Sequence, residues 1–142
     1  MSDMTGVEIA ARARALLGVR FRPQGRSAES GLDCIGLVAA ALGVEDARAD
    51  YALRGGSIAE LERELAAAGL SRVAGGREGD VFVMRAGPEQ LHLGIWTGSA
   101  MVHADAGLRR IVERPGRPEW DVIGVWRMRP NPPGSRNWLR ET

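Results

Sequence analysis

The sequence contains no lysine, so all 19 of its basic residues are arginines. This absence excludes reactions that need a lysine side chain, such as a phosphate-binding loop of the Walker type, a Schiff base or a serine–lysine dyad. The 18 acidic residues leave a formal net charge of +1. Bulk nucleic-acid binding usually needs a strongly basic face, so this near-neutral balance argues against it.

Cysteine occurs once, at position 34, which excludes an internal disulfide framework. The two histidines and this cysteine are scattered along the chain and do not form a zinc-ligand pattern, so we expect no metal and no other cofactor. No apolar run approaches the roughly 18 residues of a transmembrane helix, and the first residues lack the apolar core of a signal peptide. We therefore expect a protein made in the cytoplasm without a membrane anchor.

Arginines gather near the N-terminus, at Arg12, Arg14, Arg20, Arg22 and Arg26. A solvated surface is the simpler interpretation of such a patch, and contact with an acidic polymer is the alternative.

The length of 142 residues and the 44% hydrophobic content are typical of one globular domain, which we place at residues 1–128. Capping residues and helical spacing predict helices over 5–17, from 34 to 42 and over 57–68. Alternating apolar residues predict strands near 80–85, 91–97, 100–105, 109–113 and 122–128. Helices followed by strands predict an α+β fold with an antiparallel sheet of five to six strands. We interpret 20–32 and 44–56 as loops and 129–142, which is rich in proline, as an extended tail.

Cys34 stands where a polar segment changes into an apolar helix. Asp33 is a good N-cap residue, so Cys34 is predicted in the first helical turn, packed with its helix on the sheet. Free N–H groups and the helix dipole favour a thiolate at that place. The alternative is that a lone cysteine is a small buried hydrophobic residue.

Both histidines fall in one predicted hairpin. If Gly98 and Ser99 form a two-residue turn, His92 and His103 share one face of the two strands as diagonal neighbours. A three-residue turn would place them on opposite faces. With both histidines on one face, Cys34 would attack a carbonyl and His92 would take the thiol proton. His103 would orient His92, with Asp105 as the reserve candidate for that role.

Five short motifs in this order resemble those of the NlpC-type cell-wall cysteine peptidases, which have a compact papain-like fold. The family signature runs Gly-x-Pro-Tyr, Asp-Cys-Ser-Gly-Leu-Val, Gly-Asp-Val, His-Val-Gly-Ile-Tyr and Ile-His-Ala. This chain has Gly18-Val19-Arg20-Phe21, Asp33-Cys34-Ile35-Gly36-Leu37-Val38, Gly79-Asp80-Val81, His92-Leu93-Gly94-Ile95-Trp96 and Val102-His103-Ala104.

The resemblance implies Cys34 as nucleophile, His92 as base and His103 as the third member of a catalytic triad. It implies hydrolysis of amide bonds in peptidoglycan stem peptides, typically between D-glutamate and diaminopimelate. The Gln24-Gly25-Arg26 segment and Ile35 are similar to the branch found in phage tails and gene-transfer-agent-like particles. That branch implies tail-tip or baseplate hub proteins as partners, and action on the cell wall from within a particle.

The chain departs from the family pattern at two positions. Phe21 replaces a tyrosine, and Ile35 replaces a serine that helps recycling-type relatives to bind a free amino terminus. These departures motivate an alternative function, a weakly active or inactive structural component of a tail. We expect Asp33, Phe21, Trp96 and Asp105 to contact substrate, Trp120 and Trp126 to be core residues, and Trp138 to be an anchor for a partner.

Overall fold

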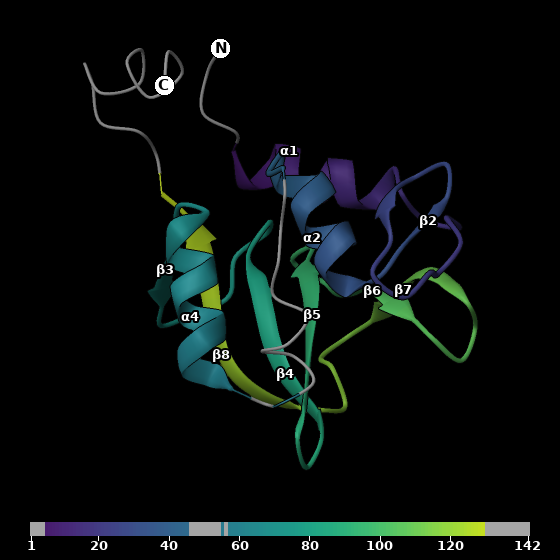
Figure 1. Ribbon diagram of the computed structural model, residues 1–142. Helices are drawn as coiled ribbons and strands as arrows, with labels where there is room; N and C mark the ends of the chain where they lie inside the picture. The colour runs from purple at the N-terminus through teal and green to yellow at the C-terminus, as the bar shows by residue number, and fades with distance from the viewer. Residues whose placement is uncertain (1–4, 46–54, 56, 130–142) are drawn as a thin grey trace.

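The computed structural model describes residues 5–45, 55 and 57–129 of the chain (Figure 1). The predicted tail at 129–142, with Trp138, lies outside these residues except for Arg129, and so does most of the predicted loop at 44–56. The first half of the chain contains the helices and a short hairpin: α1 (Gly6–Arg14), β1 (Arg26–Ser27), β2 (Gly31–Leu32), α2 (Cys34–Leu42) and α4 (Ile58–Ala67). The second half contains the strands β3 (Leu70–Val73), β4 (Val81–Gly87), β5 (Gln90–Trp96), β6 (Ala100–Asp105), β7 (Arg110–Pro115) and β8 (Asp121–Met128).

The helices begin at the capping residues that the sequence offers. Thr5 and Glu8 form a reciprocal capping box at α1, and Ser57 caps α4 through the amide of Glu60. The first helix ends at Arg14 and does not reach the predicted position 17. Leu16 and Leu17 donate to carbonyls three residues back, which tightens the chain into turns that lead to Gly18.

The six strands from β3 to β8 form one antiparallel sheet in the order β3-β8-β4-β5-β6-β7. This confirms the predicted α+β fold. Two elements were not predicted. Strand β3 is only four residues long and follows α4 directly, so its local sequence does not indicate a strand. Its pairing with β8 defines it. The β1–β2 hairpin lies inside the predicted loop at 20–32 and consists of two residue pairs.

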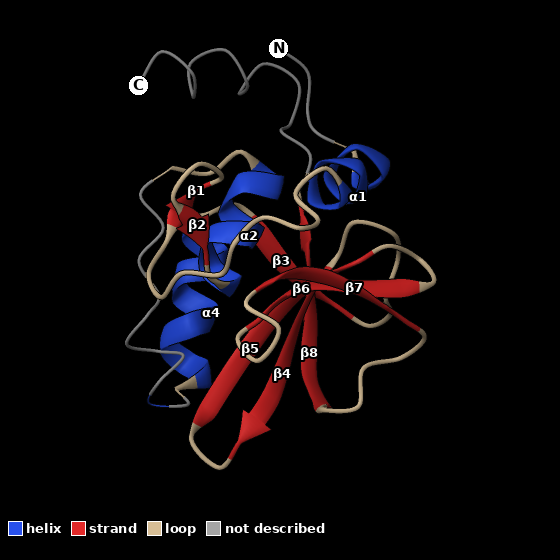
Figure 2. Cartoon of the chain, turned by 90° about the vertical axis from the view of Figure 1, so that its right-hand side faces the viewer, coloured by secondary structure: helices blue, strands red, loops and turns tan. Residues whose placement is uncertain are grey.

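The core lies between the helices and one face of the sheet. Helix α2 packs on β5 and β6, and α4 packs on β3, so the helices gather on one side of the sheet (Figure 2). The apolar residues of the hairpin face this core, as the alternation predicts: Leu91, Leu93, Ile95, Val102 and Ala104. Trp126 is also buried in the core, as expected.

The segment from Gly18 to Phe21 runs along β7, the last strand of the sheet. The amide of Gly18 donates to the carbonyl of Ile111, the amide of Ile111 donates to Val19, and the amide of Phe21 donates to Arg109, each at 2.9 Å. These bonds cover the edge of the sheet that β7 forms.

No helix in the described residues is long and apolar enough to cross a membrane.

Candidate active site

A cleft of about 460 Å³ lies between the N-terminus of α2, the β5–β6 hairpin and the loop before β8. The side chains that line it come from five separate parts of the chain. They include Phe21, Pro23, Gln24, Asp33, Cys34, Gln90, His92, His103, Asp105 and Trp120. The structure therefore brings the single cysteine and both histidines together in one concave site.

Cys34 is the first residue of α2, and Asp33 is its N-cap. The amide of Gly36 donates to Oδ1 of Asp33 at 2.8 Å, so the cap forms as the sequence predicts. Cys34 is only 7% exposed and lies at the end of the helix where backbone N–H groups are free of intrahelical partners. These groups are suited to stabilise negative charge on a carbonyl oxygen under attack.

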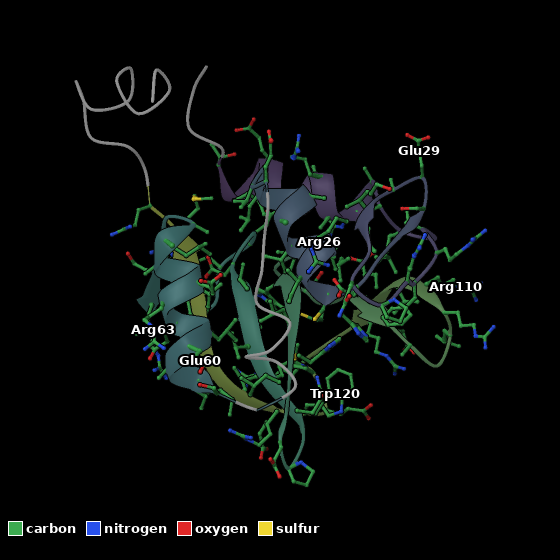
Figure 3. The ribbon with its side chains drawn as sticks, in the orientation of Figure 1. Arg26, Glu29, Glu60, Arg63, Arg110 and Trp120 are labelled. Atoms are coloured by element: carbon green, nitrogen blue, oxygen red, sulfur yellow. The ribbon has the colours of Figure 1, made fainter. Side chains whose placement is uncertain are left out.

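The Asp33 carboxylate also ties the preceding loop to the helix. Its Oδ2 accepts a bond from the amide of Gln24 at 2.9 Å, and its Oδ1 pairs with Nη1 of Arg26 at 2.8 Å. Figure 3 shows Arg26 beside α2. Asp33 thus lines the cleft, but its oxygens are held by groups of the protein, which favours a structural function for this residue.

Two glycines allow the loop to approach α2 this closely. A Cβ atom at Gly36 would overlap the carbonyl oxygen of Gly25, and one at Gly25 would overlap the carbonyl of Gly31. The glycine two positions after Cys34 therefore has a steric reason, since a side chain would push the loop away from the helix that carries the thiol.

His92 and His103 are hydrogen-bonded, with 3.0 Å between Nε2 of His92 and Nδ1 of His103. Strands β5 and β6 pair Ile95 with Val102 and Trp96 with Met101, and the amide of Thr97 donates to Ala100. This is the register of a two-residue turn at positions 98 and 99, which confirms the prediction on which the shared face depended.

The hydrogen bond between the two rings determines which ring nitrogens remain free. Nε2 of His92 is bonded to His103, so Nδ1 is the nitrogen of His92 that can accept the proton of the Cys34 thiol. If His92 accepts a proton there, it carries its own proton on Nε2 and donates it to His103. His103 then carries its proton on its own Nε2, which is buried and has no hydrogen-bond partner in the described part of the chain.

Burial raises the pKa of the Cys34 thiol to about 12, and the negative charge of Asp33 acts in the same direction. A backbone hydrogen bond from Leu93 opposes this shift but does not outweigh it. The expectation that the helix N-terminus makes Cys34 a thiolate is therefore wrong for the free protein, because loss of hydration outweighs the helix dipole. Cys34 is a neutral thiol that needs a base.

Burial, with a smaller contribution from the neighbouring His103, lowers the pKa of His92 to about 4. Burial lowers the pKa of His103 as well, against the opposing effect of Asp105. Both imidazoles are therefore neutral at neutral pH. The site consists of a neutral thiol and a neutral base, which corresponds to general-base activation and differs from a preformed thiolate–imidazolium pair.

Trp120 is a residue of the site that the sequence analysis missed, since we expected it in the core. Its ring meets the rings of His92 and His103 edge to face, at centroid distances of 5.0 and 5.5 Å. It lies just before β8, near the lower ends of β4 and β5 in Figure 3. Its contact with the histidines depends on how the loop before β8 folds back, and no local pattern in the sequence reports that path.

The predicted substrate-contacting residues do not all reach the cleft. Phe21, Asp33 and Asp105 line it, whereas Trp96 does not and stacks on Phe82 at a centroid distance of 5.4 Å. The expectation for Trp96 needs correction, because it shares a sheet face with the histidines but lies at the far end of the strand. Asp105 accepts hydrogen bonds from the amide of Leu108 and from Arg114, and no bond joins it to either imidazole.

Ile35, where relatives have a serine, is buried in the core and does not line the cleft. Its side chain points away from the substrate site, so this departure affects helix packing more directly than substrate contact. Gln24, from the Gln24-Gly25-Arg26 segment, also lines the cleft, and Gln90 is a further polar residue there that no sequence motif indicated.

Comparisons with known proteins give no match by sequence: no family model and no curated protein matches the chain with statistical significance. Solved structures do match. NlpC1 from Trichomonas vaginalis superimposes with a TM-score of 0.63 and 16% identity over 86% of this chain. The NlpC/p60 domain of the peptidoglycan hydrolase SagA gives a TM-score of 0.57 and 20% identity over 87% of this chain. The peptidoglycan hydrolase RipB from Mycobacterium tuberculosis gives a TM-score of 0.54 and 21% identity over 87% of this chain.

These similarities cover different shares of the other chains. This chain spans 44% of the length of the Trichomonas protein and 64% of RipB, but 99% of the SagA domain. The chain therefore has the papain-like α+β fold of the NlpC/p60 domains, as predicted.

Proposed function

We propose that this protein is a cysteine endopeptidase that hydrolyses amide bonds in peptidoglycan stem peptides, of the type between D-glutamate and diaminopimelate. One observation carries the proposal: Cys34, His92 and His103 line the same cleft, with the two imidazoles 3.0 Å apart. Two of the solved proteins with this fold are described as peptidoglycan hydrolases, which supports the choice of substrate.

The proposed reaction uses the groups that line the cleft. Nδ1 of His92 takes the thiol proton as Sγ of Cys34 attacks the carbonyl carbon, and His103 holds the His92 ring in the required tautomer. Backbone N–H groups at the start of α2 stabilise the oxyanion. His92 then protonates the leaving amine, and water, deprotonated by His92, hydrolyses the thioester. Trp120 packs edge to face against both rings.

We further propose that the enzyme acts as a component of a phage tail or of a gene-transfer-agent-like particle. The Gln24-Gly25-Arg26 segment and Ile35 support this, because they are similar to the tail-borne branch of the resembled family. In that setting the protein is carried in the particle, acts on the cell wall in the periplasm, and contacts hub or baseplate proteins through residues 129–142.

A test is to incubate the wild-type protein and Cys34→Ala with Gram-negative peptidoglycan and to identify the fragments by mass spectrometry. We expect fragments cut within the stem peptide from the wild type alone. Circular dichroism of both proteins provides the control for folding. Absence of such fragments, from a folded wild type and from intact particles alike, would sink the enzymatic proposal.

The second candidate is a structural tail component with little or no activity. Phe21 favours it, because it lines the cleft at the position where the resembled family has a tyrosine, so a hydroxyl group near the thiol is missing. In that case Cys34→Ala particles would assemble and deliver as the wild type does, and truncation after Arg129 would disrupt assembly.

A further inference from the structure

The arginines near the N-terminus do not form one patch in the structure. Arg12 donates to two carbonyl oxygens near the end of α2. Arg14 pairs with Glu113 at 3.2 Å, and Arg26 pairs with Asp33 at 2.8 Å. These three arginines hold structural elements together, so the free positive charge on this surface comes from other arginines.

Arg20 instead lines a groove together with Arg109, in the turn between β6 and β7, and Arg110, the first residue of β7. Arg20 lies opposite Arg110 in an antiparallel bridge. In the part of the chain that the structure describes, none of the three guanidinium groups has a hydrogen-bond or ion-pair partner. Like charges directly opposite each other repel, so the fold keeps three cations together without a carboxylate to neutralise them.

The backbone that carries these arginines is well fixed. The carbonyl of Arg109 accepts the amide of Phe21 at 2.9 Å, and the turn before it is closed by the bond from Leu108 to Asp105. Arg109 has a φ of 62°, in the left-handed region that arginine rarely adopts. The backbone that carries the three arginines is thus held by hydrogen bonds and by the bridge to β7, which reduces the entropy lost when a ligand binds.

The three arginines line one open groove of about 710 Å³, with Leu108 as an apolar neighbour and no acidic side chain in its wall. The groove continues from the Cys34 cleft, because Phe21, Pro23 and Ala106 line both. Figure 3 shows Arg110 beside the loop that leads to α2. An extended substrate in the cleft can therefore continue into the groove.

We propose that this arginine groove binds a free carboxylate of the peptide substrate next to the cleaved bond. Planar guanidinium groups form paired hydrogen bonds with carboxylates. D-Glutamate and diaminopimelate each carry more carboxyl groups than their amide bonds use, so a substrate of this type presents free carboxylates near the cut. The inference rests on the proposed function and adds to it the group that selects the substrate.

The test measures binding apart from catalysis. Cys34→Ala is titrated by calorimetry with a soluble stem peptide containing D-glutamate and diaminopimelate, and with the same peptide after amidation of its free carboxylates. The change Arg20→Gln with Arg110→Gln is then added. The matched control is Arg63→Gln with Arg77→Gln, which removes the same charge from exposed residues outside the cleft and groove. Figure 3 shows Arg63 on α4, on the opposite side of the molecule from Arg110.

We expect the unmodified peptide to bind about tenfold more tightly than the amidated one, and added salt to reduce this preference. The Arg20/Arg110 change should abolish the preference, and the Arg63/Arg77 change should keep it. Equal binding of the two peptides by Cys34→Ala, or a preference that survives the Arg20/Arg110 change, overturns the inference.

The two proposals fail in different ways. If the wild type cuts peptidoglycan but shows no preference for free carboxylates, the groove proposal alone is wrong. If the carboxylate preference depends on Arg20 and Arg110 but the wild type cuts nothing, the groove stands as a peptide-binding site and the enzymatic function falls.

Discussion

Nε2 of His92 lies 3.0 Å from Nδ1 of His103, across the strands β5 and β6. This contact commits one nitrogen of His92 to its neighbour and leaves the other for Cys34. It also means that each ring has its working tautomer only if the other does.

The activity should depend on pH in the manner of a neutral thiol and a neutral base. Since burial lowers the pKa of His92 to about 4 and raises that of Cys34 to about 12, neither group titrates near neutrality. We expect kcat/KM on a soluble stem peptide to rise as pH increases through about 4 and to level off before neutrality. An acid limb centred near pH 6.5 would instead indicate an exposed, ordinary imidazole.

His103 should tolerate asparagine better than leucine. The asparagine oxygen can accept the proton of His92 Nε2, whereas leucine leaves that donor buried without a partner. We expect kcat to fall about tenfold for His103→Asn and by roughly 100-fold or more for His103→Leu, at similar KM. Equal losses in the two variants, with both shown to be folded by circular dichroism, would contradict the orienting role.

Trp120→Ala should raise the pKa of His92 toward its ordinary value. Burial is the main cause of the lowered pKa, and the Trp120 ring contributes to that burial at a centroid distance of 5.0 Å. NMR titration of the imidazole signals measures the shift. Trp126→Ala is the control, because this tryptophan is 3% exposed in the core. It should cost about 3–5 kcal/mol of unfolding free energy and leave the pKa of His92 in place.

Gly36→Ala should destabilise the loop that closes the cleft. The new Cβ would overlap the carbonyl oxygen of Gly25, so the loop must move away from α2. We expect a loss of about 1–3 kcal/mol in urea unfolding, together with reduced activity. Gly75→Ala is the matched control, because a Cβ there has no atom within 4 Å and should change little. If both variants unfold at the same urea concentration as the wild type, the close approach is not rigid.

The half-buried His92 should make the fold less stable in acid. Its pKa is about 4 in the folded protein, below its ordinary value of 6.5, so the unfolded chain binds the proton more tightly. Stability is therefore full above pH 6.5 and falls as pH decreases toward about 4, by at most about 3 kcal/mol from this group. Urea unfolding at several pH values measures the slope. His92→Gln should lose this part of the pH dependence, and an unchanged slope would contradict the assignment.

Local chemistry made much of the fold predictable. Thr5, Asp33 and Ser57 each cap the helix that follows them, and Gly98 with Ser99 fixes an even register in the hairpin. These features depend on residues within a few positions of one another, so the sequence contains them directly. The shared face of the two histidines follows from that register alone.

Contacts between distant segments could not be predicted in this way. Strand β3 exists because β8 pairs with it, and Trp120 reaches the histidines because the loop before β8 returns over the cleft. Trp96 lies on the same face of the sheet as the histidines, as the alternation of side chains along the strands predicts. The alternation does not predict how far along the strand the cleft extends. The same holds for Arg20 and Arg110, which are 90 positions apart and meet only through pairing at the sheet edge.

The sequence by itself determined the helices, the hairpin register and the three residues proposed for catalysis, because capping, alternation and turn length act over short distances. The tertiary structure alone decided the state of those residues. The charge of a thiol or an imidazole depends on all the atoms that exclude water from it. Here those atoms make Cys34 a neutral thiol and His92 a neutral base, although the local sequence favoured a thiolate.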